Sequence, residues 1–97
     1  MTNEQKSILS IRIVAAIMTV FRQIIGVIAR IDKIGPVRVE YVAQDMGVNI
    51  VDLRVWLKLM DALRLVDYHF LFEADVVILK LPFLDALGFD IAKLEAE

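Results

Sequence analysis

Cysteine is absent from this sequence, and glycine, proline and histidine are scarce. Without cysteine the chain can form neither a disulfide nor a thiolate metal site, and a single histidine, His69, cannot build a histidine-based metal site. There is no glycine-rich phosphate-binding loop, and no serine has a base at a recognisable spacing. We therefore expect no catalytic residue, no metal and no cofactor, which favours a protein that is not an enzyme.

An excess of positive charge is also missing, because the net charge is −2. General nucleic-acid binders carry such an excess to attract phosphate. The charge is uneven along the chain: residues 1–38 hold six Lys/Arg against two Asp/Glu, or +4, and residues 39–97 hold five against eleven, or −6. The longer C-terminal part therefore has the wrong sign for phosphate attraction.

Hydrophobic residues, by contrast, make up 59% of the 97 residues, and the mean hydropathy is +0.66. A domain of this length buries only about two thirds of its surface, so we expect an oligomer whose interface extends the core. A monomer with a dense core is the alternative. The absence of cysteine is typical of a cytoplasmic protein, and the scarcity of Asn and Gln is typical of a thermophilic source.

A long helix is predicted for residues 3–32, starting with a capping-box pattern at Thr2 and Gln5. Its polar residues fall within a narrow stripe, and a helix that is apolar on most of its circumference is buried on most of it. We therefore expect one side to pack on its own domain and the other on the same helix of a second subunit, as a homodimer. The candidate dimer-interface residues are Ile13, Ile17, Phe21, Ile24 and Ile28.

The apolar run at residues 8–31 is also long enough to raise the question of a membrane span. Arg12, Arg22 and Arg30 interrupt it, and charges near the centre of a helix are costly in lipid. The sequence therefore favours a helix packed in protein, with no membrane as a partner.

Residues 37–81 predict a helix–turn–helix followed by a β-hairpin. A short strand is compatible with residues 37–39, a short helix with residues 40–46, and a left-handed turn with Gly47. Asn49 is a suitable N-cap for a third helix that reaches about Leu63. Alternating Tyr68, Phe70 and Phe72, a turn at residues 73–75 and a β-branched return strand predict the hairpin. A last helix is predicted at residues 82–97, and Gly88 weakens it. The sequence leaves open whether Gly88 divides this helix into two pieces.

Residues 35–81 resemble the winged helix–turn–helix superfamily. The resemblance depends on the helix and turn at residues 39–47, the helix at residues 49–63, and Leu65-Val66 leading into the hairpin; many members have glycine where this chain has Arg64. It implies a mainly α fold with a small β-hairpin, in which residues 1–97 form a single domain with added N-terminal and C-terminal helices. The architecture is similar to that of small dimeric archaeal and viral winged-helix proteins.

In DNA-binding members of the superfamily, the helix that matches residues 49–63 enters the major groove. Its expected core face is formed by Leu53, Trp56, Leu57, Met60 and Leu63. The resemblance therefore implies a dimeric protein of transcription-regulator type that binds double-stranded DNA. The candidate DNA-binding residues are Arg38, Asn49, Arg54 and Lys58.

The outer side of the same helix supports a second hypothesis. Val51, Val55 and Leu59 are apolar residues typical of a protein interface, and the expected hairpin tip offers Glu73 and Asp75, where many winged-helix proteins carry basic residues. The alternative is a protein–protein interaction module, an adaptor or subunit of a nucleic-acid-processing assembly, that does not bind DNA itself. The sequence leaves both hypotheses open.

Overall fold

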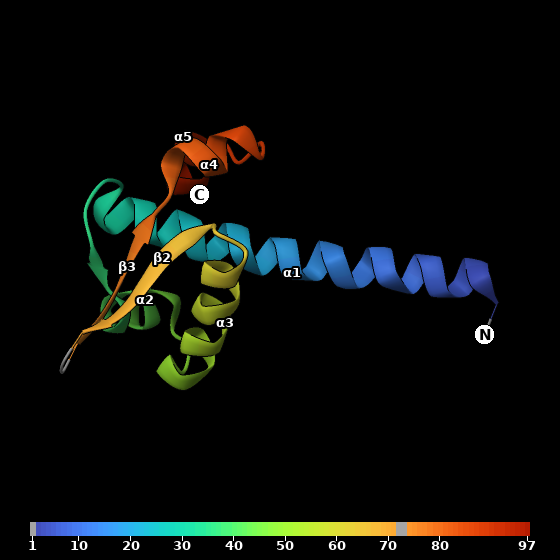
Figure 1. The fold of residues 1–97 in the computed structure, drawn as a ribbon, viewed down its shortest axis with the longest axis horizontal. Coiled ribbons are helices and arrows are strands. Elements are labelled where there is room, and N and C mark those ends of the chain that lie inside the picture. The colour runs from blue at the N-terminus through green and yellow to red at the C-terminus, as the bar shows by residue number, and fades with distance from the viewer. Residues whose placement is uncertain (1, 72–73) are drawn as a thin grey trace.

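A computed structural model of the chain describes residues 2–71 and 74–97 (Figure 1). The fold is mainly helical with a small β-hairpin, as the sequence predicts, and a short third strand extends the hairpin to a three-stranded antiparallel sheet. In chain order the elements are α1 (Asn3–Asp32), β1 (Val37–Arg38), α2 (Val39–Met46), α3 (Ile50–Ala62), β2 (Val66–Leu71), β3 (Ala74–Leu79), α4 (Leu81–Ala86) and α5 (Ile91–Ala96). The molecule is elongated, 48 × 27 × 23 Å, because the N-terminal half of α1 projects beyond the other elements (Figure 1).

The ends of α1 are fixed by side-chain hydrogen bonds. The amide of Gln5 donates to Thr2 Oγ1 at 3.2 Å, and the amide of Thr2 donates to Gln5 Oε1 at 2.9 Å, which confirms the predicted capping box. At the other end, Asp32 Oδ1 accepts from the amides of Ile34 and Gly35. These bonds turn the chain out of the helix at the predicted boundary.

The turns around α2 and α3 follow the sequence prediction. Gly47 ends α2 in the left-handed conformation with φ +65°, and Asn49 Oδ1 accepts from the amide of Val51 at 2.7 Å. The last helix, predicted at residues 82–97 with a division at Gly88 left open, is two short helices. Gly88, with φ +89°, lies between α4 and α5.

The sheet has the order β1-β3-β2, so the predicted hairpin pairs β2 with β3 and the short strand β1 extends the other edge of β3. Val77 lies opposite Tyr68 on one side and opposite Val37 on the other. Phe72 and Glu73, expected in and beside the hairpin turn, lie outside the described residues. Phe70, one of the aromatic residues of the predicted hairpin, is exposed.

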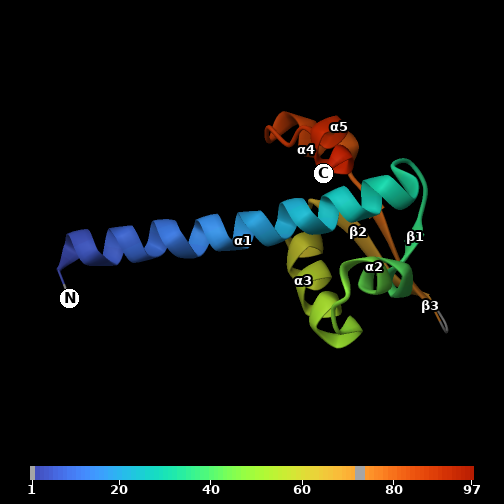
Figure 2. The same ribbon diagram turned by 180° about the vertical axis from the view of Figure 1, so that it is seen from behind.

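The C-terminal half of α1 is the central element of the core. Opposite views show α2 and α3 on one side of α1 and α4 and α5 on the other, while the strands of the hairpin run across the C-terminal half of α1 (Figures 1 and 2). The ring of Phe21 packs edge-on against that of Trp56 at 5.9 Å between centroids. The largest fully buried side chains are Ile24, Ile25, Ile28, Leu53, Leu57, Met60, Leu84, Val37, Val39, Val42, Val66 and Val77.

This core changes the expected dimer interface. Phe21, Ile24 and Ile28 are buried inside the single chain, so they have almost no surface to offer a second one. Ile17 is half-buried against the same core, and Ile13 is exposed. Three of the five predicted dimer-interface residues are therefore buried within the chain's own core, and the prediction is wrong for them.

Gly26 sets the distance between α1 and α5. A Cβ added at Gly26 would lie 2.7 Å from the carbonyl oxygen of Leu94, a backbone atom that can yield only if α5 moves. Glycine is therefore required at this position by the contact between the helices, although it weakens an isolated helix.

We predict that Gly26→Ala lowers the free energy of unfolding by about 1–3 kcal/mol through overpacking, even though alanine is the better helix former by about 1 kcal/mol. Urea denaturation followed by circular dichroism measures the change. Ser10→Ala, an exposed position on the same helix, is the control, and its effect should stay within about 0.5 kcal/mol. Unchanged or increased stability of Gly26→Ala would contradict the close approach.

Candidate functional site

The solvent-facing side of α3 carries a row of apolar side chains. Val51, Val55 and Leu59 follow one another at intervals of four residues and are 61%, 64% and 42% exposed. Residues four apart lie one above the other on a helix, so the three form a continuous strip, here called the α3 stripe. This is the strip that the sequence assigns to a protein partner.

The opposite side of α3 faces the core. Leu53, Leu57 and Met60 are buried, and Trp56 is half-buried against the core, as predicted. Leu63, expected on the same face, is exposed and was wrongly assigned. It follows the last helical residue, where the chain turns towards β2, so the helical spacing no longer governs its direction.

One residue of α3 is tied to the hairpin. Arg54 Nε donates to Asp75 Oδ2 at 2.8 Å, and Tyr68 Oη donates to the same oxygen at 2.8 Å. Asp75 is only 5% exposed. These three side chains, here called the Asp75 cluster, join α3 to β2 and β3.

The electrostatics of the cluster follow from this geometry. Burial raises the pKa of Asp75, but the hydrogen bonds from Arg54 and Tyr68 outweigh it and hold the pKa below the ordinary value. Burial, followed by the hydrogen bond to Asp75, raises the pKa of Tyr68 to about 12. The hydrogen bond to Asp75 also raises the pKa of Arg54. At neutral pH the cluster is a carboxylate held by a guanidinium and a phenol.

The position of Asp75 corrects the sequence prediction, which placed this residue on an exposed acidic hairpin tip. In β3 the residues alternate between the two faces, and Asp75 shares the inward face with Val77 and Leu79. The alternation of side chains along a strand therefore indicates that Asp75 points inward with Val77. The sequence does not predict the burial of Asp75, because a carboxylate is rarely buried unless it is paired. The partners of Asp75, which are Arg54 and Tyr68, are distant in sequence.

Three of the four candidate DNA-binding residues make contacts within the chain, and two of them, Arg38 and Arg54, line the same small hollow beside Asp75. Arg54 is held by Asp75, and the side chain of Asn49 caps α3. Arg38 pairs with Glu40 at 3.4 Å, and its guanidinium lies 5.9 Å from the centroid of the Tyr41 ring. Lys58 is exposed and has no ion pair among the described residues.

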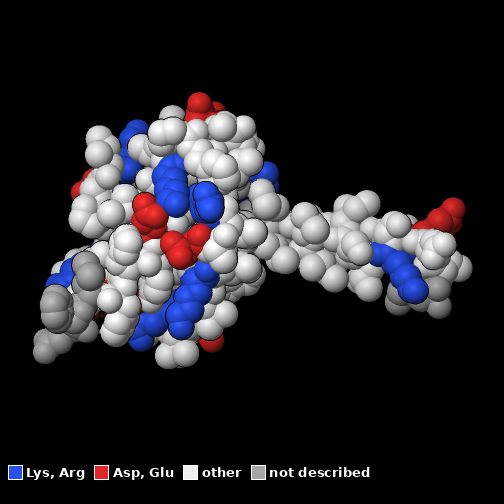
Figure 3. All heavy atoms as spheres, in the orientation of Figure 1, with Lys and Arg blue, Asp and Glu red and all other residues white. Residues whose placement is uncertain are grey.

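Other basic side chains are neutralised in the same way. Salt bridges also join Arg30 to Asp45, Lys33 to Glu95, and Lys80 to Asp67. On the face shown in Figure 3, acidic and basic side chains lie next to one another over the body of the molecule, while the projecting helix is almost uncharged away from its end. On this face, the described residues therefore give phosphate no extended positive surface to bind.

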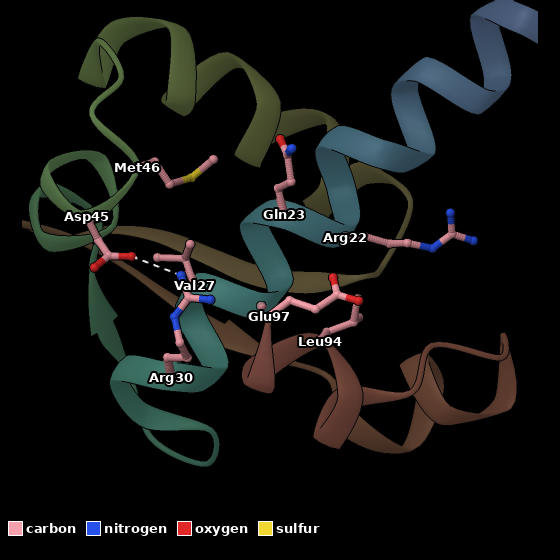
Figure 4. Close-up of a pocket in the computed structure, with 9 residues that line it drawn as sticks. Arg22, Gln23, Val27, Arg30, Asp45, Met46, Leu94 and Glu97 are labelled. Carbon is pink, nitrogen blue, oxygen red and sulfur yellow. Dashed lines mark hydrogen bonds and ion pairs between the residues drawn. The ribbon is translucent and has the colours of Figure 1, made fainter.

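A shallow pocket of about 410 Å³ lies where α1, α2 and α5 meet (Figure 4). Arg30 crosses it to bond Asp45 at 3.1 Å, while the guanidinium of Arg22 points away from this pair. Within the described part of the chain, no group of three His, Cys, Asp or Glu is placed to hold a metal ion. The pocket walls thus provide polar surface but no convergent set of ligands.

Comparison with known proteins does not add an assignment to this geometry. No protein-family model matches the chain, and no match was found among curated proteins or solved structures. The function proposed below therefore depends on the α3 stripe and the Asp75 cluster.

We predict that Arg54→Ala lowers the free energy of unfolding, because it leaves a buried carboxylate with fewer hydrogen bonds. Lys58→Ala, one turn further along α3 and exposed, is the matched control and should change stability by less than about 0.5 kcal/mol. Chemical denaturation of both variants measures the difference. Equal effects of the two substitutions would show that the Arg54–Asp75 pair contributes nothing beyond surface charge.

The cluster also predicts a pH dependence. Because the folded pKa of Asp75 is lowered, its stabilising contribution is present above the unfolded pKa near 4 and is lost as the pH falls through the folded value. Because the folded pKa of Tyr68 is raised to about 12, its contribution is present below pH of about 10 and is lost as the pH rises through 12.

The measurement is the stability difference between the wild-type protein and Asp75→Asn, determined by urea denaturation across pH. We expect the difference to be largest near neutral pH and to shrink below pH of about 4, where the wild-type carboxylate becomes protonated. A difference that stays constant down to pH of about 2 would mean that the charge of Asp75 is not what stabilises the cluster.

Proposed function

We propose that this chain is a winged-helix protein–protein interaction module whose α3 stripe binds an apolar surface of another protein. The order of helix, strand, helix, helix and hairpin supports the winged-helix assignment made from the sequence. A further support is Arg64, which has φ +64°. It stands at the position where many winged-helix proteins have glycine, the residue that adopts this conformation without strain.

The observation that carries the proposal is the exposure of the α3 stripe. In the winged-helix architecture this side of α3 is the one presented to a ligand. Here it exposes Val51, Val55 and Leu59, with Lys58 and Asp52 beside them. Apolar residues in the middle and charged residues around them are typical of the centre and rim of a protein interface.

The Asp75 cluster supports the same proposal. Arg54 is the α3 arginine that would contact a base edge or a phosphate, and its Nε and Nη2 both donate to Asp75. Binding DNA through Arg54 would require breaking this pair and leaving a buried carboxylate without its cation, which is costly. The pair instead holds the hairpin against α3 beside the α3 stripe.

DNA binding by a dimeric transcription-regulator-type protein is the second candidate. The order of the elements favours it, because winged-helix proteins commonly place this helix in the major groove. Lys58 and Arg64 are the exposed basic residues on α3 and at its C-terminal end. This candidate requires those two side chains to supply the phosphate contacts that Arg54 does not.

A binding experiment with two matched variants tests the proposal. Because Val55 is exposed, Val55→Asp should leave the fold intact and reduce partner binding at least tenfold by placing a charge in an apolar contact. Lys58→Ala, its neighbour on the same side, should retain binding. The measurement is quantitative capture of the partner from cell extract on the immobilised protein, after nuclease treatment, with circular dichroism as the folding control.

The opposite pattern would contradict the proposal. If Lys58→Ala removes binding, Val55→Asp keeps it and nuclease treatment releases what is captured, then α3 contacts nucleic acid and the second candidate is correct.

A further inference from the structure

The projecting part of α1 is exposed and strongly apolar. Every residue from Thr2 to Ala16 is exposed, and no other described element packs around them. The large apolar side chains among them are Ile8, Leu9, Ile11, Ile13 and Val14. Monomeric proteins rarely expose apolar surface of this extent, so it marks an interaction site.

One face of this helix has the spacing of a helix–helix interface. Its residues follow one another at alternating intervals of four and three, the repeat by which two helices pack side by side. These residues, here called the α1 seam, are Glu4, Ile8, Ile11, Ala15, Met18 and Arg22. The seam begins with the sole acidic residue of residues 1–31 and ends with an arginine.

The fold itself limits the length of the seam. The next position in the same repeat is Ile25, which is fully buried in the chain's own core. Beside it, α5 covers Gly26 so closely that a Cβ there would lie 2.7 Å from Leu94. The accessible part of the face therefore runs from Glu4 to Arg22, about 27 Å at ~1.5 Å per residue. Within it, Met18 is half-buried at the edge of the core. The midpoint of this stretch lies between Ile11 and Ala15.

We propose that a second copy of this chain packs on the α1 seam in antiparallel orientation, with the two-fold axis between Ile11 and Ala15. In such a pair, the numbers of facing residues add up to 26. Ile8 then faces Met18 of the second copy, and Ile11 faces Ala15. Each apolar seam residue meets another, and the end of each helix stops where α5 of the other copy begins.

The charges at the two ends select this arrangement. In the antiparallel register, Glu4 faces Arg22 of the second copy, and the pair occurs twice. A parallel pairing would instead place Glu4 against Glu4 and Arg22 against Arg22, which is repulsive. In the single chain both side chains are exposed, and neither forms an ion pair with another described residue.

The other apolar face of α1 offers no such match. It contains Leu9, Ile13 and Val20, and the charge on it is Lys6. Towards the C-terminus the same side of the helix carries Ile24, which is buried in the chain's own core. A second copy on that face would gain no complementary charge and would meet the body of the domain.

A membrane is a poorer occupant of the projecting helix. By length and composition alone, α1 is long and apolar enough to cross a bilayer. However, its residues from Phe21 to Ala29 lie almost entirely in the core, and Ile17, Met18 and Val20 are half-buried against it. The apolar part that is fully exposed is therefore residues 8–16. These 9 residues span about 14 Å, less than the ~30 Å of a bilayer core, and Arg12 lies among them.

Cysteine cross-linking tests the antiparallel register, because the natural chain has no cysteine. Glu4→Cys and Arg22→Cys chains, when mixed and oxidised, should give a covalent dimer. Each variant alone should give none, because like positions lie about 27 Å apart and a disulfide requires Cα atoms within about 7 Å. Cross-linking of Glu4→Cys alone would show a parallel pair, and a monomer in sedimentation at all concentrations would overturn the proposal.

Charge reversal provides a second readout that does not depend on a disulfide. Glu4→Arg should raise the Kd of the dimer about tenfold, and Glu4→Arg combined with Arg22→Glu should restore it. If the double variant is no better than the single one, or if the protein sediments with phosphatidylcholine vesicles instead of self-associating, the register is wrong. None of these variants changes the α3 stripe. A failure of the antiparallel dimer would therefore not contradict the proposed function, which the Val55→Asp experiment tests separately.

Discussion

The buried carboxylate of Asp75 is the constraint on which the arrangement of the candidate site depends. It is almost fully removed from water, so it requires donors, and Arg54 of α3 and Tyr68 of β2 supply them. These hydrogen bonds hold the hairpin against α3, and they engage the guanidinium of Arg54 within the chain. The solvent-facing side of α3 therefore presents mainly the apolar α3 stripe. In this way the pairing of Asp75 determines the character of the α3 surface.

The helix α1 divides its length between two environments. Its C-terminal half contacts α2, the sheet and α5, and supplies the largest part of the buried core. Its N-terminal half continues with the same apolar composition into solvent. The many hydrophobic residues of this short chain thus lie in two places. Some form the core of one copy, and others form the exposed face that we assign to a second copy. The boundary between them is set by α5, which lies on Gly26.

The helix ends, the turn at Gly47, the cap at Asn49 and the pairing of the hairpin could be predicted from the sequence, because each depends on residues close together in the chain. Three features could not. The burial of Phe21, Ile24 and Ile28 within one chain depends on which elements cover α1, and a helix apolar on nearly all sides does not specify this. The pairing of Arg54 with Asp75, 21 residues away, depends on tertiary contacts. The division of the last helix depends on Gly88 adopting φ +89°.

The most direct test of the account is the binding of fluorescently labelled duplex DNA, followed by anisotropy at low and at near-physiological salt. The central claim is that α3 presents an apolar protein-binding surface and that its arginine is already occupied. The account therefore predicts no binding at either salt concentration. Binding that is tight at low salt and weakens steeply as salt is added would show that basic side chains neutralise phosphates, and it would contradict the claim.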